Sequence, residues 1–230
     1  MAESVWTRPR RGKEQPALTR AQIVAEAIRL LDTDGLDTLS MRNLGTRLGA
    51  GATSLYRHVA NKDELIELVV DEVYGELEDP AAEGWRGTLT AAAHSVRAMI
   101  LRHPWMASVL GQVGLSYLGP NVMRLNENLL AALEADGFTL HDADQAVSAV
   151  VSYVIGMSTA EAAWLTSLAR SGREEAEWIA ALRPAALAAA EPYPRMRALM
   201  DRADDTPDAT RGDNFVYGLN RLLDGLEHRP

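Results

Sequence analysis

Cysteine is absent from this 230-residue chain, which excludes disulfide scaffolds, thiolate metal sites and cysteine nucleophiles. Long apolar runs are absent too, because none reaches the roughly 18 residues that cross a bilayer. The first 15 residues lack the apolar stretch of a secretory signal. The hydrophobic and charged fractions, 47% and 24%, are those of ordinary globular domains. We therefore expect a soluble, cytoplasmic protein with no membrane partner.

Signals of strands and of catalysis are also missing. Apolar residues recur at helical spacing along most of the chain, while strand alternation is nowhere convincing, so the predicted fold is all-α. The five histidines show neither His-x-x-x-His nor Glu-x-x-His spacing, and His141 with Asp142 and Asp144 is interpreted as a helix start. No nucleophile elbow and no glycine-rich phosphate loop is visible. The sequence predicts no metal, no cofactor and no enzymatic activity.

Positive charge is scarce overall but unevenly distributed. The formal net charge of -9 disfavours a polyanionic partner. Residues 1–63 nevertheless carry ten Lys/Arg and seven Asp/Glu, a net +3, whereas residues 64–230 carry -12. Residues 1–18 are predicted to form a flexible basic arm whose four cations lie within six positions: Arg8, Arg10, Arg11 and Lys13. Such an arm is either a solvated tail or, beside a DNA-reading module, a segment that follows phosphates or enters a minor groove.

Helix start and stop signals predict a three-helix domain over residues 19–63. Thr19 with Gln22 forms a capping box for a helix over about 20–34. Ser40 caps a short second helix, which a glycine-containing turn ends. A third helix is predicted over about 52–58. Two short helices joined in this way have the spacing of a helix-turn-helix.

A linking helix is predicted over 62–79, and the outward face of the short helix before it is rich in donors and acceptors. Its members are Thr53, Ser54, Tyr56, Arg57 and His58. A structural helix would carry Glu and Lys on such a face. In a major groove, Arg57 could pair with guanine O6 and N7, and the Thr53 methyl could meet a thymine methyl. Lys62, at the start of the linking helix, suits a phosphate.

Residues 80–230 are predicted to form a larger helical domain. Its helices are expected at about 88–102, 105–112, 121–136, 142–169, 174–190 and 214–228, with a polar loop at 204–213. The helix over 142–169 is apolar around most of its circumference, which places it in a core or a subunit interface. The terminal helix has one leucine-rich face that needs either an intrachain partner or a second subunit.

A ligand pocket is predicted among residues 92–164. Its side chains are flexible or aromatic, and few of them carry a polar group that could bind a ligand. Such a lining suggests a large, flat, largely apolar small molecule. Each side chain taken singly fits a core position equally well. The predicted lining is Val96, Met99, Trp105, Met106, Leu110, Tyr117, Met123, Asn126, Tyr153, Met157 and Trp164.

The segment from Leu18 to about Leu77 contains LSMRNLGTRLGAGATSLYRHVANKDEL and resembles the DNA-binding domain of the TetR family of bacterial transcriptional regulators. The string from Leu55 to Lys62 is its most specific part. FVYGLNRLLDGLE, at 215–227, is similar to the tetracycline repressor branch. The resemblance implies that bases face Arg42, Ala52, Thr53, Ser54, Arg57 and His58. It implies that phosphates face Ser40, Tyr56 and Lys62.

The resemblance also implies a repressor with a palindromic double-stranded DNA operator, a small-molecule inducer and a homodimer built from the helices near 142–169 and 214–228. The regulated gene would serve efflux or biosynthesis. Where the tetracycline repressor has a histidine for drug-bound magnesium and an asparagine for the drug, Leu110 and Ala92 stand here. This departure argues against tetracycline-magnesium as the ligand. A ligand-independent regulator, or a helical ligand-binding protein or enzyme that retains the helix-turn-helix, remains an alternative.

Overall fold

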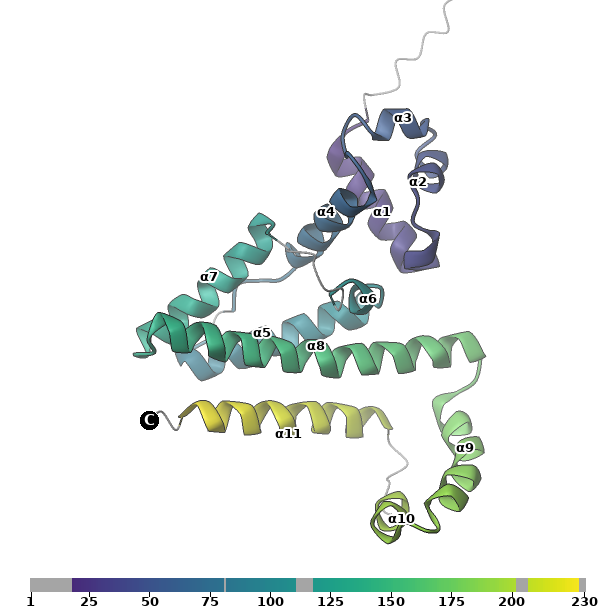
Figure 1. The fold of residues 1–230 in the computed structure, drawn as a ribbon, viewed down its shortest axis with the longest axis vertical. Coiled ribbons are helices and arrows are strands. Elements are labelled where there is room, and N and C mark those ends of the chain that lie inside the picture. Colours follow the sequence, from purple (N-terminus) through teal and green to yellow (C-terminus); the bar gives the residue numbers. More distant parts are fainter. Residues whose placement is uncertain (1–17, 81, 111–117, 202–206, 228–230) are drawn as a thin grey trace, which may run out of the picture. The chain divides into compact units, whose positions relative to one another are not determined.

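The computed structural model describes residues 18–80, 82–110, 118–201 and 207–227, and every regular element in these ranges is helical (Figure 1). The all-α prediction is confirmed. The chain divides into two compact units, Met1–Val69 and Val70–Pro230, and the division falls inside one helix. Most of the predicted arm, residues 1–17, lies outside the described residues.

The first unit is built from short helices around a small core. They are α1 (Arg20–Asp34), the 3-10 turn η1 (Leu36–Thr38), α2 (Met41–Arg47), α3 (Ala52–Leu55) and the beginning of α4 (Lys62–Tyr74). The predicted capping box opens α1, because the Gln22 amide donates to Thr19 Oγ1 at 3.2 Å and the Thr19 amide donates to Gln22 Oε1 at 3.0 Å. The core side chains Ile23, Ala27, Leu44, Leu55 and Leu65 are fully buried.

Two helices of this region end earlier than the sequence predicts. α3 ends at Leu55, and residues 56–58 form turns in which the amides of His58 and Val59 both donate to the Leu55 carbonyl oxygen. α4 ends at Tyr74 instead of 79, because Gly75 and the turn residues after it leave the helix. Leu77, which follows the end of α4, is nevertheless buried.

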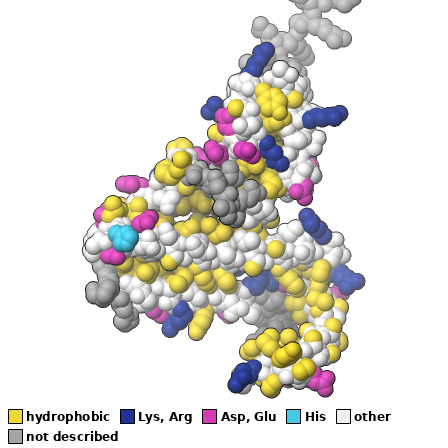
Figure 2. Space-filling model, viewed as in Figure 1, with side chains coloured by type: hydrophobic (Ala, Val, Ile, Leu, Met, Phe, Trp, Pro, Cys, Tyr) yellow, Lys and Arg dark blue, Asp and Glu magenta, His cyan; other side chains and the backbone are white. Residues whose placement is uncertain are grey.

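The second unit is organised around one long helix. It contains α5 (Gly84–Arg102), α6 (Met106–Leu110), α7 (Pro120–Ala135), α8 (Leu140–Ser171), α9 (Glu175–Ala190), α10 (Pro194–Asp201) and α11 (Pro207–Glu227). α8 packs against α5, α6, α7 and α11, while α9 and α10 lie beyond its C-terminal end (Figure 1). Their hydrophobic side chains gather at the surface (Figure 2), and Tyr193 and Leu199 are 61% and 64% exposed.

Two prolines account for the main differences from the predicted helices of this unit, Pro194 and Pro207. α10 is not among the predicted helices, because a proline such as Pro194 can end a helix as well as begin one; here it begins the helix. Pro207 likewise begins α11, so residues 207–213 of the predicted polar loop are helical and residues 204–206 lie outside the described ranges. α9 continues through Pro184.

An ion network ties four helices of the second unit together. Arg97 on α5 donates to both carboxylate oxygens of Glu161 on α8, at 2.8 and 2.7 Å. Arg211 on α11 lies 3.6 Å from Glu161 and also pairs with Glu175 on α9. The Arg211 hydrogen bonds hold the pKa of the Glu175 carboxyl below its usual range. Glu161 is only 8% exposed, so the network is part of the core.

Within the described ranges, α8 alone has the length and apolar composition that a bilayer span requires, and 39% of that stretch is buried in the protein. Core helices of globular proteins meet the same requirement. α8 packs against four other helices and carries Glu161, which pairs with Arg97. These contacts identify α8 as a core helix.

Candidate nucleic-acid interface

The turn between α2 and α3 is fixed by a backbone contact. A Cβ atom on Gly45 of α2 would lie 2.7 Å from the carbonyl oxygen of Ala50, so this helix and the turn approach more closely than any side chain permits. The Ala50 amide donates to the Gly45 carbonyl oxygen at 2.8 Å. Gly49 has φ +63, a conformation that favours glycine. This contact sets the distance between the two short helices.

The start of α2 holds two of the predicted contact residues. Ser40 is the N-cap, and its hydroxyl accepts the Asn43 amide at 3.1 Å. Asn43 in turn donates its side-chain amide to the Thr38 carbonyl oxygen at 2.9 Å, which anchors the helix start to η1. Arg42 is exposed beside this cap. The Ser40 hydroxyl therefore has a structural role in addition to its predicted phosphate contact.

The predicted base-reading residues occupy α3 and the turns after it. Leu55 and Val59 are buried as anchors. Thr53 and Ser54, which precede Leu55, and Arg57, which lies between the two anchors, are exposed. Two aromatic side chains complete the surface: Tyr56 is 53% exposed, and His58 is half-buried. Ala52 is also half-buried at the first position of α3. The short helix and its turns thus present one surface of hydroxyl, guanidinium and ring groups.

The cations of this unit fall into two groups. Arg47 is paired with Asp34 at 2.5 Å and with Glu26 at 3.6 Å, and Arg29 is paired with Glu26 at 2.9 Å. The ion pairs found among the described residues include none with Arg42, Arg57 or Lys62, although all three are exposed. Their charges are left for an external anion such as a phosphate.

Arg20, the first residue of α1, joins this second group, since it too is exposed and forms no ion pair with any residue that the structure describes. Sequence reasoning does not single out Arg20. The available signal is its position at a helix start, where a cation is unfavourable for the helix and needs another reason to be present. Among the residues described in this unit, it is the fourth cation without an ion pair, after Arg42, Arg57 and Lys62.

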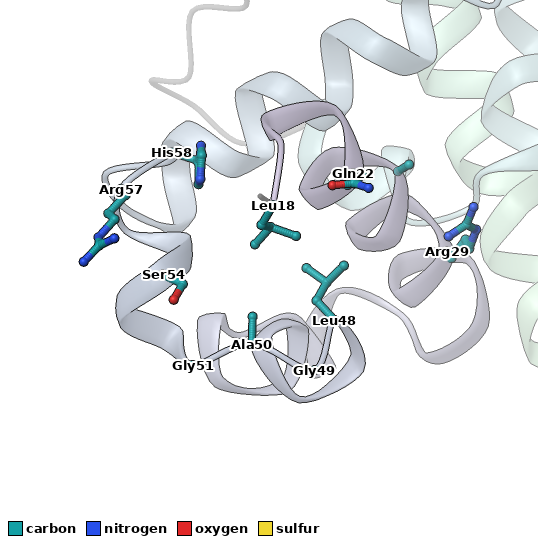
Figure 3. A pocket seen from close by; sticks show the side chains of 11 residues that line it. Leu18, Gln22, Arg29, Leu48, Gly49, Ala50, Gly51, Ser54, Arg57 and His58 are labelled. Carbon is teal, nitrogen blue, oxygen red and sulfur yellow. The ribbon is translucent and has the colours of Figure 1, made fainter. Parts of the chain in front are cut away.

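A hollow of about 930 Å³ lies beside the base-reading residues (Figure 3). Side chains of α1 and of the α2–α3 turn line it, and Ser54, Arg57 and His58 stand at its rim. In the close-up, Arg57 extends away from the other labelled side chains. Leu18, the last residue of the predicted arm, also lines this hollow. The four cations of the predicted arm precede Leu18 in the sequence and lie outside the described residues.

The predicted ligand residues of the second unit occupy different environments. Val96, Met99, Trp105 and Met106 are buried, with at most 6% exposure, while Met123 is 44% exposed. Leu110, Asn126 and Met157 are half-buried, and Tyr117 lies outside the described residues. Their role in binding a ligand stays a prediction.

Three of the polar groups in this predicted lining already have partners within the protein. The Tyr153 hydroxyl on α8 donates to the Phe215 carbonyl oxygen on α11 at 2.9 Å, and burial raises the pKa of this phenol. The Trp164 indole donates to Glu175. The Asn126 side-chain amide donates to the Val122 carbonyl oxygen of its own helix at 2.9 Å. Because of these hydrogen bonds, few polar groups of the predicted lining are left to bind a ligand.

Metal-ligating side chains do not gather anywhere in the described part of the chain. The sequence at His141 and Asp142 opens α8, where Thr139 Oγ1 accepts the Asp142 amide at 3.2 Å. That geometry is a helix cap, as the sequence suggests. His103 is 5% exposed and lies 3.3 Å from Glu76.

Comparison with known proteins gives matches over both units. The family model "Tetracyclin repressor-like, C-terminal domain" matches residues 78–229, and the family model "Bacterial regulatory proteins, tetR family" matches residues 23–69.

Individual relatives match as well. An HTH-type transcriptional regulator of Saccharopolyspora erythraea is 43% identical over 164 residues, which cover 70% of this chain and 69% of the relative's own chain. The HTH-type transcriptional repressor DrrR1 of Streptomyces coeruleorubidus is 36% identical over 235 residues, covering 98% and 84%. The crystal structure of the Streptomyces coelicolor TetR family protein ActR in complex with actinorhodin matches with a TM-score of 0.76 at 31% identity, covering 92% of this chain and 96% of that chain.

Proposed function

Since the chain belongs to the tetR family of bacterial regulatory proteins, we propose that it is a ligand-responsive repressor that binds a palindromic DNA operator as a homodimer. Members of this family are transcriptional regulators and not enzymes. The observation that carries the proposal is Arg57, which is exposed among the hydroxyl and ring groups of the α3 surface and has no ion-pair partner in the described part of the chain. A guanidinium in that setting can donate two hydrogen bonds to guanine in the major groove.

Phosphate contacts supply orientation and most of the non-specific affinity. Lys62 begins α4 and is exposed, so it can reach the backbone beside the groove that α3 enters. The predicted arm contains four further cations, and their charge would add to the affinity for phosphates. The acidic second unit, in contrast, is repelled by DNA, which confines contact to the first unit.

Two surfaces of the second unit support the homodimer. The outward face of α8 carries small exposed residues, including Ser148, Ser152 and Gly156, which allow close helix packing. α11 exposes Val216 and Tyr217, the latter by 69%. Large apolar side chains left in water favour a partner surface. A two-fold dimer places two recognition surfaces about one DNA turn apart, roughly 34–36 Å, which matches a palindrome.

The ligand is proposed to be a large, flat, aromatic molecule, and its site to lie among the predicted lining residues of the second unit. The apolar character of Val96, Met99 and Met106 supports this class. ActR, to which the chain is similar, forms a complex with actinorhodin. Binding of the ligand favours an arrangement in which α4 changes the separation of the recognition surfaces, and the operator is released. Such a regulator acts in the cytoplasm, on an efflux or biosynthetic gene.

A gel-shift with DNA from upstream of its own gene tests the proposal directly. The purified chain is expected to bind one fragment specifically, with affinity that falls steeply between two salt concentrations. Actinorhodin and a panel of planar aromatic compounds are then added, and tryptophan fluorescence is followed in parallel. Binding without release by any compound would favour a ligand-independent regulator. Absence of salt-dependent binding would contradict DNA recognition altogether.

Replacing Lys62 by alanine is expected to weaken binding to operator and to unrelated DNA by similar factors, because a phosphate contact carries no sequence information. The slope of log affinity against log salt concentration should decrease by about 0.9, since one phosphate is no longer neutralised. Arg47→Ala is the matched control, since Arg47 is already paired with Asp34. A weakening confined to the operator would show instead that Lys62 reads a base.

Replacing Tyr217 by glutamate is expected to shift the protein from dimer to monomer in analytical ultracentrifugation. The side chain is 69% exposed and lies beneath Arg221, 5.7 Å from the ring centroid, so its removal leaves the monomer fold intact. A buried carboxylate at a subunit interface is strongly unfavourable. Tyr193→Glu, at a comparably exposed tyrosine on the α9–α10 side, is the control. An unchanged dimer would remove α11 from the interface.

A further inference from the structure

The first turn of α7 takes its cap from a different helix. Gly119, its N-cap residue, has no side chain to accept the first amides. The Asp71 carboxylate on α4 accepts them instead, from Asn121 at 2.9 Å and from Val122 at 3.2 Å. The Asn121 side-chain amide donates back to the Asp71 carbonyl oxygen at 3.0 Å and to its carboxylate at 3.1 Å. Four hydrogen bonds therefore join the end of α4 to the start of α7.

Two glycines allow this contact. A Cβ atom on Gly119 would overlap the carboxylate of Asp71, and one on Gly75 would lie 3.0 Å from the Asn121 side-chain nitrogen. A negative charge at a helix N-terminus is also favourable, because the helix dipole is positive there. We call this set of residues, Asp71 with Gly119, Asn121 and Val122, the α4–α7 clasp.

A second contact attaches the same part of the chain to the end of α5. Glu76, two residues beyond α4, accepts a hydrogen bond from Arg102 at 2.7 Å and lies 3.3 Å from His103 Nε2. Residues 104–110, which include α6, follow His103 directly. The end of α4 is thus joined both to the residues that precede α6 and to the first turn of the next helix, α7.

We propose that Asp71 is the positioning residue through which the arrangement of α6 and the start of α7 is transmitted to α4. α4 begins in the unit Met1–Val69 and ends in the unit Val70–Pro230, so Asp71 lies on a helix that both units share. A displacement of the first turn of α7 moves the α7 cap and, with it, the end of α4. This inference rests on the proposed function, because it requires DNA binding by the first unit.

Coupling between two sites is reciprocal, so operator DNA must in turn alter α6 and the start of α7, and this can be measured without knowing the inducer. The experiment is amide hydrogen exchange on the full chain, alone and with a duplex carrying the operator found by gel-shift. In the parent chain, DNA is expected to change the exchange rates of residues 104–110 and 119–125 by about 5-fold or more. In Asp71→Ala, operator affinity should stay close to that of the parent, while the DNA-dependent change in exchange disappears.

Thr139→Ala is the matched control, because it removes a side-chain cap from α8 in the same unit without touching α4. It should keep the DNA-dependent change. If thermal melting shows that Asp71→Ala does not fold, Gly119→Ala breaks the same clasp from the α7 side. The inference would be overturned if a folded clasp variant showed the same DNA-dependent change in exchange rate as the parent chain. It would also be overturned if the parent chain bound the operator with no change in the exchange rates of residues 104–110 and 119–125. A parent chain that binds no DNA would overturn the proposed function instead.

Discussion

Replacing Arg57 by alanine is expected to weaken operator binding by about 1–3 kcal/mol and to relax specificity at a single base position. The guanidinium is exposed and has no ion-pair partner among the described residues, so its removal breaks no ion pair between them. The protein's free energy of unfolding should accordingly stay unchanged. A gel-shift series with the operator and its single-base variants, together with urea unfolding, measures these effects.

Arg29→Ala is the matched control for this prediction. Arg29 also lines the hollow beside α3, but it is paired with Glu26 and lies on α1. Its removal should leave base preference unchanged. If Arg57→Ala weakened binding equally on every DNA sequence, Arg57 would be assigned to a phosphate, and an unchanged affinity would remove it from the interface.

Replacing Glu161 by alanine is expected to lower the free energy of unfolding by about 3 kcal/mol, because a largely buried ion pair loses one partner. Arg97 and Arg211, at 19% and 20% side-chain exposure, would each keep a charge facing the vacated space. Arg97 is further held over the Phe215 ring at 5.1 Å, which limits its escape to water. Urea unfolding at fixed protein concentration measures the change.

Two further variants show whether the destabilisation comes from the unpaired charge. The double replacement Arg97→Met with Glu161→Leu removes both charges and should recover most of the stability, since apolar pairs of similar volume can replace buried ion pairs. Asp201→Ala breaks the exposed Arg197–Asp201 pair and should change stability by less than about 0.5 kcal/mol. A double variant as unstable as Glu161→Ala would attribute the destabilisation to packing instead.

Local signals in the sequence predict much of this fold. Thr19 with Gln22 and Ser40 both cap helices where their spacing indicates, because a cap depends on residues three positions apart. The TetR resemblance is confirmed as well. Proline accounts for the main errors, since the same residue ends one helix or begins the next, and only the contacts of the following turn decide between them.

Contacts between distant parts of the chain are not predictable in this way. Arg97 and Glu161 are separated by 64 residues, and Asp71 precedes Asn121 by 50. No periodicity relates such partners, since the packing of whole helices brings them together. The predicted DNA-contacting surface of α3 is easier to recognise from the sequence, because Thr53 to His58 are adjacent in the chain. Arg20 cannot be recognised in this way, because its exposure and its lack of an ion pair with any described residue appear only in the folded unit.

The close approach of Gly45 to the Ala50 carbonyl oxygen has a consequence for engineering. Backbone atoms, not the exposed side chains, set the distance between α2 and α3. Thr53, Tyr56 and Arg57 can therefore be varied together in a library without disturbing the frame that carries them, provided that Gly45 stays fixed. From such a library, repressors can be selected that bind altered operators and are still released by the parent's inducer.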